Sequence, residues 1–253
     1  MNQQTAKIFL LIALVIGLTN CGSDGTGPGN GGNSVSISRT SVTLTFLGET
    51  TQLTATVRNS KNEPVSGQVA WSSDAPTVAT VSSNGLVTAI GNGQATLTAA
   101  AEGLSATASA TVQQVPTSLS IVSGNTQTDT VGQLLVEPLV VRAEDQGGTA
   151  VSAVSIEFSV SQGGGSLSET SATSGGDGEA STSWTLGTTS GTQNVTALIE
   201  GSGGATANFS ATATPGPATV FSKESGDQQI GKNDRALPEP VIAAVKDEFG
   251  NGI

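Results

Sequence analysis

The side chains that could do chemistry in this chain are mainly carboxylates, and they occur in three close pairs. The pairs are Glu144 with Asp145, Asp177 with Glu179, and Asp247 with Glu248. Such pairs can bind calcium where several oxygens converge, or act together in glycoside hydrolysis. All three lie in predicted turns, and no Asp-x-Asp-x-Asp run is present. We therefore interpret them as solvated turn acids, with weak calcium binding as the alternative.

Two glycine-rich runs have the spacing of nucleotide-binding loops. Residues 226–232 fit the first seven positions of a phosphate-binding loop, but Asn233 stands where magnesium requires Ser or Thr. Residues 27–32 fit the spacing G-x-G-x-x-G, but they lie in a Gly-rich segment with no strand before it. We predict a β-sandwich loop for the first run and a flexible tether for the second.

The composition excludes most catalytic chemistries. The chain has 253 residues with no His, no Tyr and one Cys, so it cannot build a Ser-His-Asp triad, a Cys-His pair or an internal disulfide. Six Phe and two Trp leave few aromatic side chains for sugar contacts. Nine basic against 20 acidic residues, a formal net charge of −11, do not suit nucleic acid. We expect no enzyme activity, no catalytic, metal-binding or cofactor-binding residue, no cofactor and no nucleic-acid partner.

The elements that must position these residues are short strands. From residue 35 onward apolar residues alternate with polar ones, as in 53–58, 95–99 and 106–112, and this period of two indicates strands with one buried face. Turn signals separate the runs, and Asn84-Gly85 and Asn92-Gly93 are the strongest hairpin signals among them. About seven strands in fewer than 80 residues favour an antiparallel sandwich. The predicted fold class is all-β, as antiparallel β-sandwiches without helices.

The N-terminus has the pattern of an export signal. An apolar run of 11 residues, 8–18, follows Lys7 and is shorter than the roughly 20 residues that span a bilayer. The next residues, 18–21, are Leu-Thr-Asn-Cys and resemble the lipobox of bacterial lipoproteins, with Asn20 where that family usually has Gly, Ala or Ser. The resemblance implies that Cys21 is lipidated and that residues 1–20 are removed. An ordinary signal peptide with an incidental cysteine is the alternative.

A tether and a first module follow the cysteine. Residues 21–33 are rich in Gly and are expected to be flexible. The motifs Trp71-Ser-Ser-Asp, Val78-Ala-Thr-Val, Gly85-Leu-Val-Thr-Ala and Gly91-Asn-Gly-Gln-Ala are similar to the bacterial Ig-like domain, group 2. The resemblance places this module at 34–114. We expect Trp71 to lie in its core, facing Leu53, Val57 and Leu97.

A second module and the start of a third follow. Residues 115–215 are similar to the invasin-type bacterial Ig-like domain, group 1, with an alternating strand at 154–160, a glycine turn at 163–165 and a Val-x-Ala strand at 195–197. An ungapped offset of 102 then places 225–253 on 123–151. Because two strands cannot close a sandwich, we expect 216–253 to be an incomplete repeat of a longer protein, poorly packed alone.

These observations predict a lipid-anchored protein of the outer membrane or cell surface. The lipid on Cys21 would attach the protein to the membrane. Its tandem immunoglobulin-like (Ig-like) modules would form a stalk and an adhesion array of the invasin and intimin type. The ligand of this array would be a surface protein or a carbohydrate. The alternative is that the modules are spacers of a larger surface enzyme, for example one that degrades a polysaccharide. The sequence leaves open whether calcium stiffens the joints near Pro116 and Pro215.

Overall fold

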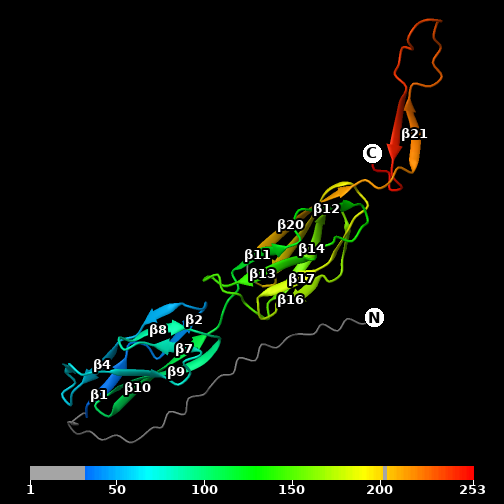
Figure 1. Ribbon diagram of the computed structural model, residues 1–253. Helices are drawn as coiled ribbons and strands as arrows, with labels where there is room; N and C mark the ends of the chain where they lie inside the picture. Colours follow the sequence, from blue (N-terminus) through cyan, green and yellow to red (C-terminus); the bar gives the residue numbers. More distant parts are fainter. Residues whose placement is uncertain (1–31, 202–203) are drawn as a thin grey trace, which may run out of the picture.

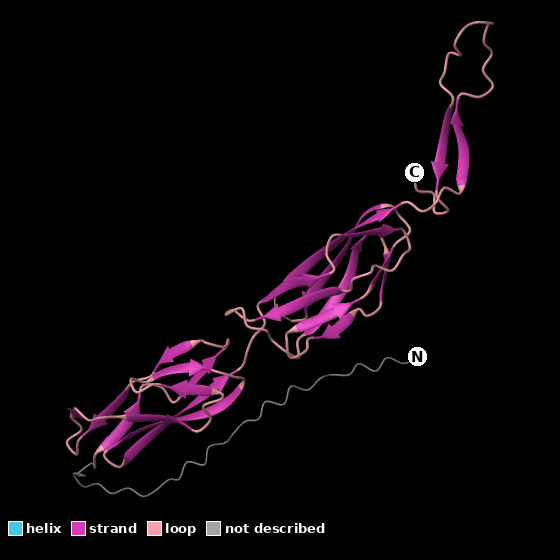
Figure 2. Ribbon diagram, viewed as in Figure 1, coloured by secondary structure: helices cyan, strands magenta, loops and turns pink. Residues whose placement is uncertain are grey.

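A computed structural model describes residues 32–201 and 204–253, and within these ranges all regular structure is strand. The strands form a long row of separate units joined end to end (Figures 1 and 2). The predicted signal peptide and Cys21 lie outside the described residues. No helix in the part that is described is long and apolar enough to cross a membrane. The predicted all-β fold without helices therefore holds for the described chain.

The first module contains ten strands in three small sheets. One sheet has the order β2-β10-β9-β6, a second has β1-β4-β5 and a third has β3-β8-β7. All neighbours are antiparallel except β2 and β10, which run parallel. The strands are β1 (Ser34–Ile37), β2 (Ser41–Leu44), β3 (Thr50–Gln52), β4 (Ala55–Arg58), β5 (Pro64–Val65), β6 (Ala70–Ser73), β7 (Ala79–Val81), β8 (Leu86–Ala89), β9 (Gly93–Ala101) and β10 (Leu104–Val112).

Alternation along β9 and β10 builds the core of this module. Ala95, Leu97 and Ala99 of β9 are buried, while the residues between them face outward or are half-buried. Leu53 is also buried, as expected. Trp71 differs from its predicted place in the core, because it is only half-buried and packs against the core from its edge. It lies on β6, the outermost strand of its sheet, where one side of the strand has no neighbour to cover it.

The two strongest turn signals of this module have different outcomes. Asn84-Gly85 links β7 to β8, with Gly85 at φ 85° and its N–H donating to the carbonyl of Ser82 at 2.9 Å. Asn92-Gly93 leads from β8 into β9, which belong to different sheets. The hairpin predicted from Asn92-Gly93 is therefore wrong, because the chain crosses here from one layer of the sandwich to the other.

The second module contains the next ten strands. Its sheets have the orders β11-β13-β17, β12-β20-β19-β14-β16 and β15-β18, and β12 runs parallel to β20. The strands are β11 (Ser118–Ser123), β12 (Gln127–Thr130), β13 (Leu139–Glu144), β14 (Ser155–Gln162), β15 (Gly165–Leu167), β16 (Ser171–Thr173), β17 (Glu179–Thr182), β18 (Trp184–Leu186), β19 (Gly191–Ile199) and β20 (Thr206–Thr214). The parallel pair recurs at the same kind of place as in the first module.

The second module has the larger core, and Trp184 is its largest fully buried side chain. Phe158 and Phe209 pack in the same cluster, from β14 and β20. Trp184 is therefore a core residue and not an exposed anchor for a ligand. No disulfide is available to the chain, so this packing holds the two layers together.

The last two strands, β21 (Val220–Ser225) and β22 (Ile242–Lys246), form an isolated hairpin that repeats β11 and β13. In the second module, the Gln127 side chain bonds to the main chain of Gly124 and Glu137. Gln229 makes the same three bonds to Gly226 and Glu239, 102 residues later, at 2.7–2.8 Å. The run 226–232, whose spacing resembles a phosphate-binding loop, lies in the connection of this hairpin with no helix after it, as the prediction of a loop between strands requires.

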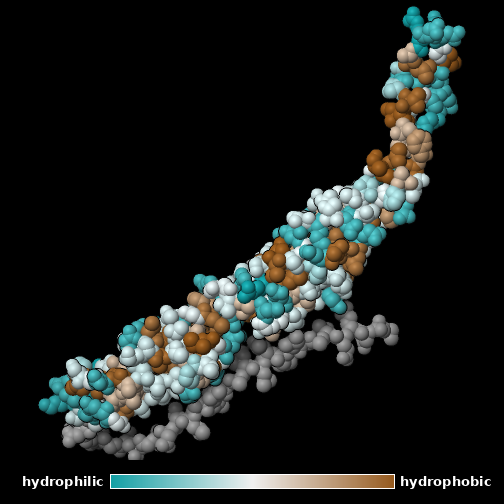
Figure 3. Space-filling view, in the orientation of Figure 1, coloured by the Kyte–Doolittle hydropathy of each residue, from teal (hydrophilic) through white to brown (hydrophobic). Residues whose placement is uncertain are grey.

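The hairpin lacks the partners that its counterpart has. β13 pairs with β17 on its second edge and buries Leu139, Val141 and Ala143, whereas Val241 and Val245 of the hairpin are exposed. Figure 3 shows apolar side chains on the surface over this end of the chain. An exposed apolar face and an unpaired edge give little protection against local opening.

We therefore expect limited proteolysis to cut first within the hairpin, in the connection 226–241. The matched internal control is the corresponding segment 124–139 of the second module, which should stay intact while 226–241 is cleaved. Intact-mass spectrometry of the products over time measures both. Equal protection of the two segments would contradict the expectation that the third repeat is poorly packed.

Candidate functional site

In the described part of the chain, the buried carboxylates lie at the joints between units. No ligand-sized pocket is present in residues 32–201 and 204–253, and no group of three or more His, Cys, Asp or Glu side chains in these ranges is arranged to hold a metal ion. Few polar side chains are fully buried, and the carboxylates among them are Asp145 and Asp247. Asp145 directly follows β13 and Asp247 directly follows β22, its counterpart 102 residues later. We therefore take the two joints as the candidate site.

Asp145 closes a tight turn directly after β13. Its Oδ1 accepts hydrogen bonds from the main-chain N–H groups of Gly147 and Thr149, both at 2.9 Å. Gly148 in the same turn has φ 78°, a left-handed conformation that glycine adopts without steric cost. Asp favours such turns because its short side chain can accept bonds from the main chain that follows it.

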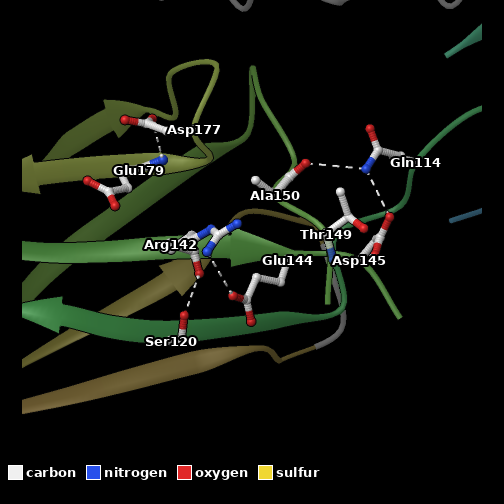
Figure 4. Close-up of polar contacts among 9 residues, drawn as sticks. All are labelled: Gln114, Ser120, Arg142, Glu144, Asp145, Thr149, Ala150, Asp177 and Glu179. Carbon is white, nitrogen blue, oxygen red and sulfur yellow. Dashed lines mark hydrogen bonds and ion pairs between the residues drawn. The ribbon is translucent and has the colours of Figure 1, made fainter. Parts of the chain in front are cut away.

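The second oxygen of Asp145 reaches out of its own module. Oδ2 accepts from the N–H of Leu47, in the first module, at 3.1 Å and from Nε2 of Gln114, in the linker, at 2.9 Å. Figure 4 shows Gln114 pointing to Asp145 and also to the carbonyl of Ala150, at 3.3 Å. Gln114 is itself fixed to the first module by paired bonds with Asn92, at 2.7 and 3.0 Å.

The linker backbone at this joint is bonded on both sides of Pro116. The N–H of Val115 donates to the carbonyl of Thr45 in the first module at 2.9 Å. The N–H of Thr117 donates to the carbonyl of Glu144 in the second module at 2.8 Å. The linker therefore has no free segment of several residues about which the modules could swing.

The second joint is built in the same way around Asp247. Its Oδ1 accepts from the N–H groups of Phe249 and Asn251 at 3.0 and 2.8 Å, and its Oδ2 accepts from the N–H of Gly216 at 2.9 Å. The Asn251 side chain donates to Asp247 Oδ2 at 2.7 Å and to the carbonyl of Thr188 at 2.9 Å. Gly216 and Gln114 occupy equivalent positions in the repeat, 102 residues apart.

The same hydrogen bonds keep both carboxylates ionised. Burial raises the pKa of Asp145, but the bonds from Gln114, Thr149, Leu47 and Gly147 outweigh this effect and hold the pKa below its ordinary value. At Asp247 burial is likewise outweighed, by bonds from Asn251, Gly216 and Phe249, which lower its pKa to about 2. Each contribution to stability is therefore present above the ordinary Asp pKa and is lost as the pH falls through the lowered value.

This bonding leaves little room for calcium. An ionised carboxylate has about four lone-pair sites, and at both joints four N–H donors already fill them. Calcium would need those oxygens and several more within its coordination shell. The joints are therefore arranged to accept N–H donors in place of a cation.

The three predicted carboxylate pairs do not converge on a site. Glu144 is half-buried and lies 3.8 Å from the guanidinium of Arg142 (Figure 4). Asp177 is exposed and caps its own turn by accepting from the N–H of Glu179 at 3.0 Å. Glu248 is exposed. Asp145 and Asp247 lie in turns as predicted, but the prediction that they are solvated is wrong, because both carboxylates are buried at the joints, where they accept hydrogen bonds from the linker. Their recurrence at the same repeat position was the signal that the sequence offered.

Comparison with known proteins supports the family of the first module. Residues 33–112 match the family model of the bacterial Ig-like domain (group 2), so the predicted group 2 module and Ig-like fold are confirmed. No sequence among the curated proteins matches the chain. The lipoprotein assignment, the group 1 assignment of the second module and the predicted domain boundaries stay predictions.

Solved structures of surface proteins are similar to the chain at low identity. The Escherichia coli adhesin FdeC has 19% identity and a TM-score of 0.41, over 89% of this chain and 76% of that chain. The Yersinia pseudotuberculosis adhesin InvE has 18% identity and a TM-score of 0.35, over 83% and 74%. The surface layer protein SbsC, domains 4–9, has 18% identity and a TM-score of 0.34, over 87% of this chain. The chain spans 37% of that SbsC structure, about a third of its length.

Proposed function

We propose that this chain is a lipid-anchored bacterial surface protein in which Ig-like modules form a stalk. Acylation of Cys21 would anchor it in the membrane, and two or more acyl chains give stable anchoring where a single chain gives marginal binding. The Gly-rich segment 21–33 would lift the first module away from the lipid surface. The modules would then extend outward and carry no catalytic step of their own.

The observation that carries this proposal is that the two modules have separate hydrophobic cores and are joined through a hydrogen-bonded linker. The hydrophobic core of 42–112 and that of 131–213 are distinct, and the linker between them is hydrogen-bonded on both sides of Pro116. A chain built to enclose a substrate would bring its domains together around a cleft. Modules that are joined end to end through short bonded linkers instead give length, which is what a stalk needs.

The binding part of the proposal rests on exposed loops and strand edges. Connecting loops carry most recognition in Ig-like scaffolds, and free strand edges accept extended segments of a partner. The partner would be a surface protein or a carbohydrate on another cell or on the same envelope. The net charge of −11 favours partners that are neutral or basic.

Metabolic labelling with a fatty acid tests the lipid anchor, and protease treatment of intact cells tests surface display. We expect the natural chain to incorporate label and to be cleaved by external protease. Cys21→Ala should lose the label and leave the envelope fraction, whereas Thr26→Ala in the tether should behave as the natural chain does. Equal label in the Cys21→Ala and natural proteins would rule out lipidation, and full protection in intact cells would rule out surface display.

A further inference from the structure

We propose that Asp145 and Asp247 are positioning residues that set the angle between consecutive units of the chain. Each would use one carboxylate oxygen to shape its own turn and the other to hold the unit that precedes it. This inference rests on the proposed stalk function, because it explains how a row of small modules stays extended. It assigns to these two turn acids a role that connects modules, beyond a local role in their turns.

At both joints Oδ1 bonds to the turn that follows the Asp, and Oδ2 bonds to the linker that precedes it. Oδ1 accepts only from the turn that follows, at residues 147 and 149 in one repeat and 249 and 251 in the next. Oδ2 accepts from the linker at both joints, through Gln114 at the first and Gly216 at the second, and at the second it also accepts from the Asn251 side chain. A local turn preference does not explain the bonds from the linker, because the Oδ1 bonds already close each turn.

The joint also makes direct contact with the body of the preceding module. At the first joint Asp145 Oδ2 accepts from the N–H of Leu47. Gly147 packs so closely there that a β-carbon on it would lie 3.0 Å from the Phe46 ring and 3.2 Å from the Leu47 carbonyl. At the second joint this contact passes through Asn251, which bonds to the main chain of Thr188 and Ser190.

The groups that are held in the preceding module are main-chain groups. The N–H of Leu47, the N–H of Ser190 and the carbonyl of Thr188 are present whatever side chains stand at those positions. The joint therefore depends little on the side-chain sequence of the unit before it. This suits a chain in which the preceding module is differently built at the two joints, with sheet orders that do not match.

Asp145→Asn separates the two roles of the carboxylate. The amide oxygen can keep the Oδ1 bonds to Gly147 and Thr149, while the amide nitrogen replaces Oδ2 and faces two N–H donors. The turn should persist and the joint should loosen. Asp177→Asn is the matched control, because Asp177 accepts the same kind of turn bond, from the N–H of Glu179, and lies in a turn within the second module.

Spin labels on the two modules measure the joint directly. The labels are placed at exposed positions with Thr43→Cys on β2 and Ser171→Cys on β16, in full-length chain carrying Cys21→Ala so that no other thiol is present. We expect Asp145→Asn to broaden the distance distribution at least twofold, and Asp177→Asn to leave it unchanged. An unchanged distribution in Asp145→Asn, with both modules folded by circular dichroism, would overturn the proposal.

Two further variants keep the test decisive if Asp145→Asn disturbs folding. Gln114→Ala removes the linker donor and leaves the Oδ1 bonds that close the turn of Asp145, so it should broaden the distribution while both modules stay folded. In the double variant Asp145→Asn with Gln114→Glu, the amide nitrogen introduced at position 145 can donate to the carboxylate introduced at position 114. This pair should narrow the distance distribution again. Failure of Gln114→Ala to broaden it would also count against the joint. Neither result affects the Cys21 labelling experiment, so the joint and the surface anchor can fail separately.

Discussion

Replacement of Trp184 by alanine is expected to lower the free energy of unfolding of the second module by about 3–5 kcal/mol. Trp184 is fully buried and is the largest side chain in its core cluster, which also contains Phe158 and Phe209. Removing the indole would leave a cavity that the surrounding strands can fill only in part. The strand itself is held by other bonds, such as that from the N–H of Leu135 to the Trp184 carbonyl at 2.9 Å.

The Trp184 prediction has two matched comparisons in the chain. Trp71→Ala should cost the first module clearly less, because Trp71 is half-buried on an edge strand. Trp184→Phe should also cost less than Trp184→Ala, since it keeps an aromatic ring and removes a buried indole N–H that has no hydrogen-bond partner. Such a buried unpaired donor costs about 1–3 kcal/mol.

Urea unfolding followed by circular dichroism gives the free energies of all three variants. The remaining tryptophan reports by fluorescence on the module that was not changed, so each loss can be assigned to one module. Similar losses for Trp184→Ala and Trp71→Ala would contradict the difference in burial.

The strand structure could be predicted because alternation is a local signal. Along Ala95–Ala101 of β9 and Ala108–Val112 of β10 every second residue is apolar and buried, and this follows from the period of two alone. The same signal could not place Trp71, because whether a strand lies inside or at the edge of its sheet depends on distant pairings. Nor could it show that β2 pairs with β10 in parallel, since these strands lie about 60 residues apart.

Turn signals and joints show where local reasoning ends. Asn84-Gly85 and Asn92-Gly93 carry the same dipeptide, but one closes a hairpin and the other crosses between layers. Which occurs depends on the sheet that the next strand joins. The recurrence of Asp145 and Asp247 was visible as an internal repeat. Their bonds to the preceding unit were not, because a sequence does not place one module against another.

Replacement of Gly165 by alanine, in the glycine turn after β14, is the second change expected to destabilise the second module strongly. The reason is the backbone geometry of this turn. Gly165 has φ 96°, and a β-carbon on it would meet the carbonyl oxygen of Thr185 and lie 2.8 Å from the nitrogen of Gly187. Both neighbours are main-chain atoms, so neither can move aside by changing a rotamer. Gly165→Ala should therefore force β15 away from β18, to which Gly165 pairs opposite Leu186.

Gly164→Ala is the control that separates strain from collision. Gly164 has φ 78°, but the nearest atom to a β-carbon there is the Gly187 Cα, at 4.0 Å. Gly164→Ala should lower the free energy of unfolding only by the cost of a left-handed backbone at a residue with a side chain, about 1–2 kcal/mol. Gly165→Ala should add the cost of overpacking, about 1–3 kcal/mol, for a total loss of about 2–5 kcal/mol.

Urea unfolding monitored by fluorescence in a Trp71→Phe background, where Trp184 alone emits, measures both glycine variants, because Trp184 lies on β18 itself. Gly165→Ala should also shift the native emission, since the strand that carries Trp184 must move, whereas Gly164→Ala should not. Equal losses of stability with unchanged native emission would mean that β15 and β18 can absorb a methyl group at their junction. The close approach at Gly165 would then not be what requires glycine in this turn.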